Sequence, residues 1–206
     1  MLNRRQLFRH ATYLMGGALA APAALSLLHG CASEDRRTFT PKYFTPEEAA
    51  FVTAYVDTLL PRTDTPGGLD VNVDIFIDKV MHVNSQTADA PERRGEPSEM
   101  QLGIRAFDED SRASFNRAFA ELDAAQRGTL FERAEANDNP YSPRVWGVPV
   151  GEQLPIGFYR SFKSFVLWGY LSSEKIATEV LNYDPVPGEY DGDIPLASVG
   201  GRAWSL

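Results

Sequence analysis

Histidine and cysteine are so scarce in this chain that they limit the chemistry it can perform. The 206-residue sequence contains three histidines and one cysteine, and two of the histidines lie in an N-terminal segment that we expect to be removed. A Ser-His-Asp site would therefore depend on His82, because the nucleophile needs a base beside it. No Gly-x-Ser-x-Gly motif is present to supply that nucleophile. We interpret His82 as a structural histidine at a helix end and predict no catalytic residue.

Cofactor and metal motifs are also missing from the sequence. One cysteine excludes Cys-x-x-Cys-His haem attachment and iron–sulfur ligation, and one mature histidine excludes His-rich metal sites. No Gly-x-Gly-x-x-Gly dinucleotide motif occurs. Carboxylates near the C-terminus are of the type that Ca²⁺ prefers, but the glycines among them favour solvated turns instead. These carboxylates are Asp184, Glu189, Asp191 and Asp193. We predict no cofactor and no metal in this chain.

Residues 1–30 indicate an export signal. Three arginines precede an apolar stretch rich in Ala and Gly over 11–28, and the first acidic residue is Glu34. A permanent membrane anchor needs about 20 strongly apolar residues, whereas this stretch is only weakly hydrophobic and is interrupted by Pro22. A buried core helix would show a polar face, which this stretch lacks. We therefore expect the segment to be cleaved.

The arginines that precede the apolar stretch are arranged as in a twin-arginine signal. The run Asn3-Arg4-Arg5-Gln6-Leu7-Phe8-Arg9 resembles this motif, with Arg4 and Arg5 as the pair. The resemblance implies passage through the twin-arginine translocase, which accepts folded proteins. A chain without its own cofactor can then travel with a partner that carries one.

Cys31 directly follows the apolar stretch. Its position resembles a lipoprotein cleavage box, in which the cysteine becomes the acylated N-terminus, although His29 departs from the usual small or apolar residue. The alternative is an unmodified cysteine near an ordinary cleavage site. We expect a periplasmic protein that is anchored to the membrane through lipidated Cys31.

The mature chain is a single acidic domain. Removal of residues 1–30 leaves 17 basic and 28 acidic residues, a formal net charge of −11, which argues against nucleic acid or an anionic membrane surface as partner. We predict a tether over 31–42 and one domain over 43–206, long enough to bury a core.

Apolar spacing predicts a mainly α-helical domain with long irregular loops and a coil C-terminal tail. Thr45-Pro46-Glu47-Glu48 offers an N-cap, a first-turn proline and a capping-box glutamate, and Pro61 ends the helix that follows. Further helical stripes are predicted along the chain. They contain Val73, Phe76, Ile77 and Val80; Phe107, Phe115, Phe119 and Leu122; Leu130 and Phe131, after a capping box of Asp123 and Gln126; and Phe158, Phe162, Phe165 and Val166.

Turn-forming residues predict the connections between these helices. We expect a mobile surface loop over 84–98 and an irregular stretch over 137–155. In the second stretch we expect Tyr141, Trp146 and the residues 148–150 to anchor the chain to the core. A short helix is expected over 173–181, followed by coil.

The order of these motifs resembles gluconate 2-dehydrogenase subunit 3 over nearly the whole mature chain. The quoted segments are Thr45-Pro46-Glu47-Glu48 to Leu59-Leu60-Pro61, Thr63-Asp64-Thr65-Pro66-Gly67, Phe158-Tyr159, Gly169-Tyr170-Leu171-Ser172, Tyr183-Asp184-Pro185-Val186-Pro187-Gly188-Glu189-Tyr190, and Trp204. The long loop over 84–98 departs from the family pattern and leaves the details of the partner surface open.

The resemblance implies a small subunit beside a large FAD-containing oxidoreductase of the glucose–methanol–choline type, often with a multihaem cytochrome c that carries haem c. FAD then belongs to the large subunit, while this chain supplies export and assembly. We expect its partner interface to combine one turn, one helix end and part of the tail. The residues are Pro61, Asp64, Pro66, Gly67, Trp168, Gly169, Tyr170, Pro187, Gly188 and Tyr190.

Two other functions stay open at the level of sequence. A stand-alone exported lipoprotein acting as a binding or structural module would share the signal and the fold. A hydrolase that uses His82 would show activity as a purified single chain. Trp168 and Tyr170 could equally well belong to the hydrophobic core as to the partner interface, because large aromatic rings dominate interiors and interfaces alike.

The arginine pair gives the first testable prediction. Replacing Arg4→Lys and Arg5→Lys together should trap the precursor inside the cell, because lysine cannot reproduce the planar donors of the guanidinium groups. Cell fractionation and immunoblotting would follow the protein, with Arg36→Lys and Arg37→Lys as a matched control outside the motif. Normal amounts of mature protein outside the cytoplasm in the first variant would contradict the twin-arginine assignment.

Overall fold

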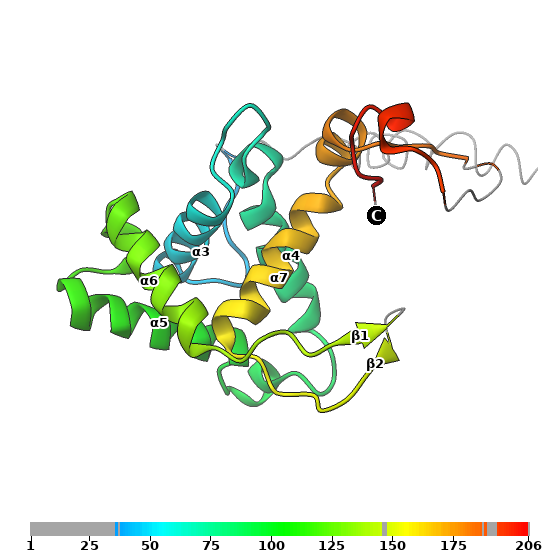
Figure 1. Ribbon diagram of the computed structural model, residues 1–206. Helices are drawn as coiled ribbons and strands as arrows, with labels where there is room; N and C mark the ends of the chain where they lie inside the picture. The colour runs from blue at the N-terminus through cyan, green and yellow to red at the C-terminus, as the bar shows by residue number, and fades with distance from the viewer. Residues whose placement is uncertain (1–35, 37, 146–147, 187, 189–192, 206) are drawn as a thin grey trace, which may run out of the picture. The chain divides into compact units, whose positions relative to one another are not determined.

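A capping box starts the first described helix. The computed structural model describes residues 36, 38–145, 148–186, 188 and 193–205, and this part is mainly helical, as predicted (Figure 1). In α3 (Pro46–Leu59) the Thr45 hydroxyl accepts from the Glu48 N–H at 3.2 Å, and the Glu48 carboxylate accepts from the Thr45 N–H at 3.1 Å. Both bonds satisfy donors that a helix start leaves free. The predicted start and the predicted end before Pro61 are confirmed.

Tyr55 of α3 lies at the centre of an aromatic core. Its side chain is fully buried, and its ring centroid lies 4.6 Å from that of Phe162 and 4.7 Å from that of Phe131. The Tyr55 hydroxyl donates to the carbonyl of Tyr159 at 3.0 Å. Burial is the main reason why the pKa of Tyr55 lies well above its ordinary value. The ring thereby joins α3 to α6 (Ala124–Asn137) and α7 (Phe158–Leu171).

Helix α4 (Val73–Asn84) packs along α7, and the two cross at the centre of Figure 1. The contact is close at Gly169, where an added Cβ would lie 2.8 Å from Cδ1 of Phe76. Any larger residue would push the two helices apart. Turn η1 (Gly68–Val71) connects α3 to α4 and contacts both.

The apolar stripe predicted from Phe107 to Leu122 does not form one continuous helix, because the helix is interrupted at Asn116. Helix α5 (Glu99–Phe115) ends there because Asn116 adopts the left-handed conformation, with φ 55°. Phe119 therefore belongs to the short turn η3 (Phe119–Glu121), and Leu122 follows it. The predicted capping box of Asp123 and Gln126 is present at the start of α6.

The segment 84–98 is attached to the core more closely than a surface loop would be. It contains the 3₁₀ turn η2 (Pro91–Arg94), and both Ala90 and Ser98 are buried. The Tyr43 hydroxyl donates to Glu92 at 2.6 Å and lies 2.5 Å from the Ser98 hydroxyl. These contacts are long-range in sequence and therefore left no local pattern.

The valines expected to anchor the stretch 137–155 point outward instead. A minimal antiparallel pair, β1 (Arg144–Val145) and β2 (Val148–Pro149), forms here, and Val145, Val148 and Val150 are exposed. That part of the prediction is wrong, because strands of two residues are too short to show an alternating pattern. Tyr141 is partly exposed but does hold the segment to α7 through its hydroxyl, and Trp146 lies outside the described residues.

The C-terminal region agrees with the prediction of a short helix followed by a mostly coil tail. The π-helical element η4 (Ile176–Val180) lies within the range 173–181 where a short helix was predicted, and η5 (Leu196–Val199) adds one 3₁₀ turn to the tail. The side-chain amide of Asn182 donates to the carbonyls of Val199 and Arg202, both at 2.9 Å. These bonds fold the tail back on itself.

Thr40–Leu206 forms one folded unit. The export signal predicted over 1–30, with Arg4 and Arg5, lies outside the described residues, as does Cys31. In the part of the chain that is described, no helix has both the length and the hydrophobicity to cross a membrane.

Asp78 fixes the start of the folded unit. Its carboxylate is 2 % exposed and accepts three backbone N–H groups, from Lys42 at 2.9 Å and from Tyr43 and Phe44 at 3.1 Å each. A buried carboxylate needs such donors in place of water. The chain is thereby held to α4 directly before α3 begins.

We predict that Asp78→Asn lowers the free energy of unfolding by about 2 kcal/mol, because an amide keeps one acceptor oxygen and turns its NH₂ group toward at least one of the three backbone donors. Urea denaturation of the mature chain would measure the loss. Asp57→Asn, at an exposed position of α3, is the control and should change stability by less than about 0.5 kcal/mol. Equal stabilities of the two variants would contradict the role of Asp78.

Candidate partner interface

Helix α7 is the element on which the expected interface residues depend. Tyr159, Phe162 and Val166 are buried on its inner face, while Trp168 is 51 % exposed on its outer face. The inner residues follow the spacing that the sequence predicted. The exposed positions of the same helix therefore have a fixed orientation.

Asp138, which follows α6, caps α7. Its carboxylate accepts the backbone N–H of Gly157 at 2.5 Å and that of Arg160 at 3.2 Å. Gly157 has no side chain with which to cap the helix itself. Because the aspartate also favours the positive end of the helix dipole, one side chain stabilises the start of α7 and joins it to the end of α6.

The same contact closes the base of a projecting segment, residues 139–156, which we call the hairpin arm. Its two sides are connected by bonds from the Asn139 amide to the Pro155 carbonyl at 2.8 Å and from the Leu154 N–H to the Ser142 hydroxyl at 2.9 Å. Among the described residues of the arm, five large apolar or aromatic side chains are exposed. They are Tyr141, Val145, Val148, Val150 and Leu154.

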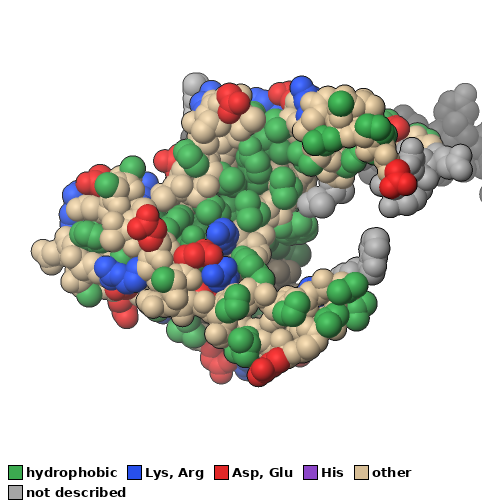
Figure 2. All heavy atoms as spheres, viewed as in Figure 1, with side chains coloured by type: hydrophobic (Ala, Val, Ile, Leu, Met, Phe, Trp, Pro, Cys, Tyr) green, Lys and Arg blue, Asp and Glu red, His purple; other side chains and the backbone are tan. Residues whose placement is uncertain are grey.

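Tyr141 connects the hairpin arm to α7. Its hydroxyl donates to the Arg160 carbonyl at 3.1 Å and accepts from the Ser164 hydroxyl at 3.0 Å, while the Arg160 guanidinium lies 5.2 Å from the ring centroid. The arm is thus ordered although its valines are exposed. In Figure 2 hydrophobic side chains gather over α7 and on the arm.

The other end of α7 holds the turn 61–67. The Tyr170 hydroxyl donates to the carbonyl of Pro66 at 2.6 Å, across 104 residues of sequence. Two of the expected interface segments, the turn and the helix end, are therefore brought together in space. Pro61 and Asp64 are exposed in this turn, and Pro66 is half-buried.

Gly67 and Gly169 occupy the interior instead of the surface. Both are buried, and an added Cβ on Gly67 would lie 2.8 Å from the backbone nitrogen of Arg62. We therefore remove the two glycines from the proposed surface and assign them to close packing.

Asp70 maintains the shape of the turn. Its carboxylate pairs with the guanidinium of Arg62 and accepts the Gly67 N–H at 2.8 Å. The hydrogen bond from Arg62 is the main reason why the pKa of Asp70 lies below its ordinary value. The pair is exposed to solvent, so it sets geometry more than stability.

Trp168 is part surface and part core. One side of its ring packs edge-on against Phe76, with centroids 5.2 Å apart, and stacks on Phe165 at 5.9 Å. The other side is exposed. A large ring with fixed rotamer and free area is typical of the anchors that dominate protein interfaces.

The expected tail residues are only partly described. Gly188 is exposed, and neighbouring Val186 is 80 % exposed. Pro187 and Tyr190 lie outside the described residues. Asn182 positions the rest of the tail through the bonds given above.

His82 and the tail carboxylates were the candidates for catalysis and metal binding, and the structure describes His82, Asp184 and Asp193. His82 is half-buried near the end of α4, and its backbone carbonyl accepts from the Ser85 hydroxyl at 2.7 Å. Among the described residues no group of three or more His, Cys, Asp or Glu could hold a metal ion. Glu189 and Asp191, two of the four tail carboxylates, fall outside that part.

Burial and Glu135 raise the pKa of Tyr159 to about 12, so this phenol stays neutral at physiological pH.

We predict that Tyr170→Phe lowers the free energy of unfolding by about 1 kcal/mol, because the Pro66 carbonyl loses its donor. Limited proteolysis should also cut the turn 61–67 faster. Tyr183→Phe, at a 55 % exposed tyrosine, is the control and should change neither property. Unchanged proteolysis in Tyr170→Phe would show that the turn is held by other contacts.

Comparison with known proteins supports the sequence resemblance. The family model described as gluconate 2-dehydrogenase subunit 3 matches residues 46–188, which is more than half of the chain. These residues run from the start of α3 into the C-terminal tail and include α7, the turn 61–67 and the hairpin arm. No curated protein and no solved structure matched. The chain belongs to the gluconate 2-dehydrogenase subunit 3 family.

Proposed function

We propose that this protein is a non-catalytic small subunit that escorts, exports and docks the FAD-containing large subunit of a periplasmic sugar or alcohol dehydrogenase. Family membership implies a subunit of a dehydrogenase complex. The observation that carries the docking role is the exposed apolar surface of α7 and the hairpin arm on a firmly packed helical unit.

The surface suits docking between folded proteins. A standard interface buries roughly 800 Å² on each partner and is dominated by a few aromatic anchors. Trp168 and Tyr141 are exposed rings whose orientations are fixed by contacts with α4 and α7, respectively. Binding then requires little ordering of these side chains, which preserves more of the interaction energy.

The export role rests on the N-terminal sequence. The pair Arg4 and Arg5 precedes a mild apolar stretch, and the translocase that reads such signals carries folded proteins. A large subunit that has bound FAD in the cytoplasm could cross in complex with this chain. Acylation of Cys31 would then hold the complex at the membrane, and the mass of the mature N-terminus tests that step.

The redox groups belong to the partners in this scheme. FAD resides in the large subunit, and haem c resides in a multihaem cytochrome c where that subunit is present. The role of this chain is to bring the flavoprotein to the membrane. His82 contributes no proton transfer.

Deletion of the gene should leave the flavoprotein in the cytoplasm or degraded, with dehydrogenase activity lost from the membrane fraction. His82→Ala, expressed in the same strain, should restore turnover to nearly the normal level, because His82 is a half-buried residue in the last turn of α4 and has no assigned role in catalysis. Activity assays and a flavin absorbance scan of both fractions measure these outcomes.

Two results would contradict the proposal in different ways. Full membrane activity in the deletion strain would refute the escort role. A large fall in turnover for His82→Ala, with the complex intact, would instead indicate catalysis in this chain.

A further inference from the structure

A cleft of about 730 Å³ lies between α4, α7 and the start of α5. Its walls are mostly apolar, and Trp168 stands beside it with half of its surface exposed. Phe162 connects the floor to the aromatic core. The apolar lining consists of Val80, Met81, Met100, Ile156, Phe158, Phe162, Phe165 and Trp168.

A second pocket of about 360 Å³ continues this cleft, because Met81, Met100, Asn84 and Glu99 line both. The two methionines therefore form a shared boundary. Thioether side chains adapt their shape to a bound surface more easily than branched side chains do. The two adjoining pockets together offer an apolar part and an acidic part, which suits a segment of polypeptide that carries side chains of both kinds.

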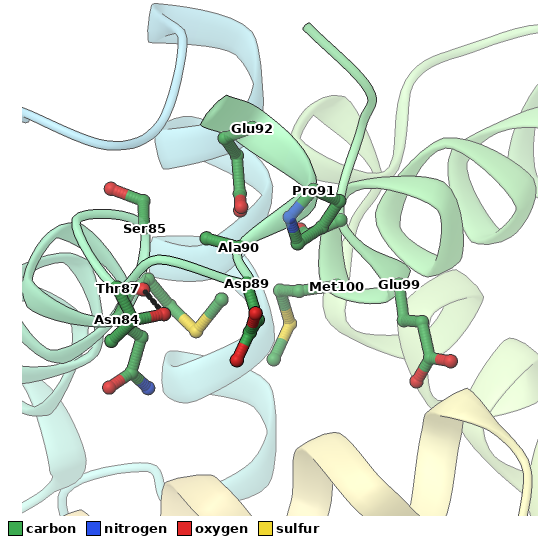
Figure 3. Close-up of a pocket in the computed structure, with 11 residues that line it drawn as sticks. Asn84, Ser85, Thr87, Asp89, Ala90, Pro91, Glu92, Glu99 and Met100 are labelled. Atoms are coloured by element: carbon green, nitrogen blue, oxygen red, sulfur yellow. Dashed lines mark hydrogen bonds between the residues drawn. The ribbon is translucent and has the colours of Figure 1, made fainter. Parts of the chain in front are cut away.

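The second pocket is acidic where the first is apolar. Asp89, Glu92 and Glu99 line it, and Figure 3 shows the carboxylates of Asp89 and Glu99 pointing to the same side of the pocket, with Met100 between them in this view. Glu92 accepts from the Tyr43 hydroxyl. Among the described residues neither Asp89 nor Glu99 has a basic partner.

In the described part of the chain the nearby arginines form no ion pair with these two carboxylates, although Arg94 contacts the Asp89 backbone. Arg94 pairs with Glu96 at 2.9 Å and donates to the backbone carbonyl of Asp89 at 3.3 Å, while Arg93 donates to the Gln86 carbonyl at 3.4 Å. The side chains of Asp89, Glu92 and Glu99 thus make this end of the cleft acidic. A basic side chain on an occupant would complement it.

We propose that this cleft binds an apolar segment of the dehydrogenase large subunit that carries a lysine or arginine next to its apolar residues. The apolar side chains of the segment occupy the space beside Trp168 and Phe165, and its basic group lies between Asp89 and Glu99. This inference rests on the proposed function, since it names the part of the flavoprotein that the small subunit holds.

Site-specific photo-crosslinking tests the location. The purified complex would carry p-benzoylphenylalanine in place of Trp168, with the same residue in place of Leu102 as control. Leu102 is 52 % exposed on α5 and lines neither pocket. The Trp168 probe should crosslink to one peptide of the large subunit, rich in apolar residues and containing Lys or Arg, whereas the Leu102 probe should give none.

Charge reversal tests the electrostatic part. Asp89→Lys with Glu99→Lys should weaken binding of the large subunit about tenfold, because two rim charges would repel the basic group. Glu109→Lys with Glu132→Lys makes the same change in net charge at exposed positions outside the cleft and should bind nearly normally. Titration at low and high salt would separate charge effects from folding, and circular dichroism would confirm that each variant folds.

The outcomes distinguish this inference from the proposed function. Failure of the unmodified chains to co-purify would overturn both. Co-purification with crosslinks from Leu102 but not from Trp168 would overturn the cleft alone, as would a crosslink to a lipid, to a small molecule or to a second copy of this chain. Equal affinity of the two charge-reversed variants for the large subunit would contradict the proposed lysine or arginine between Asp89 and Glu99.

Discussion

The hydrogen bond from the Tyr55 hydroxyl to the Tyr159 carbonyl, inside an aromatic core, is the contact on which the rest of the fold depends. It joins the first described helix to the last long one. The bond sits among rings of α5, α6 and α7, so breaking it would leave a buried polar atom without a partner. Because α7 carries the candidate interface on its other side, the geometry of the core sets the geometry of the surface.

Helix α7 is held at three levels along its length. Asp138 caps its first turn, Tyr55 and Phe162 hold its middle, and Gly169 permits close contact with Phe76 near its end. Tyr141 and Tyr170 then attach the hairpin arm and the turn 61–67 to the two ends. A surface built this way keeps its shape before a partner arrives, which is what association between already folded proteins requires.

The distribution of polar contacts is consistent with a role in assembly. The buried carboxylate of Asp78 is used to fix backbone, and Asp138 is used to cap a helix. The exposed carboxylates of Asp89 and Glu99 stand at the edge of an apolar cleft. Family membership gives this arrangement its context, since a subunit of a dehydrogenase complex needs a recognition surface for its partners.

The sequence by itself determined the helical class, the capping boxes at Thr45 and Asp123, the inner face of α7 and the family. The helical features follow from residues three or four apart, whose side chains share one face of a helix, and the family follows from the order of motifs along the chain. It also indicated the segments around Pro66 and Tyr170, because turn and aromatic residues are locally recognisable. Only the tertiary structure decided that Tyr170 holds Pro66, that Gly169 is a packing residue, and that the valines of the hairpin arm point outward. The acidic, methionine-lined cleft was equally invisible in the sequence. Each of these features depends on contacts between residues far apart along the chain, which no local spacing records.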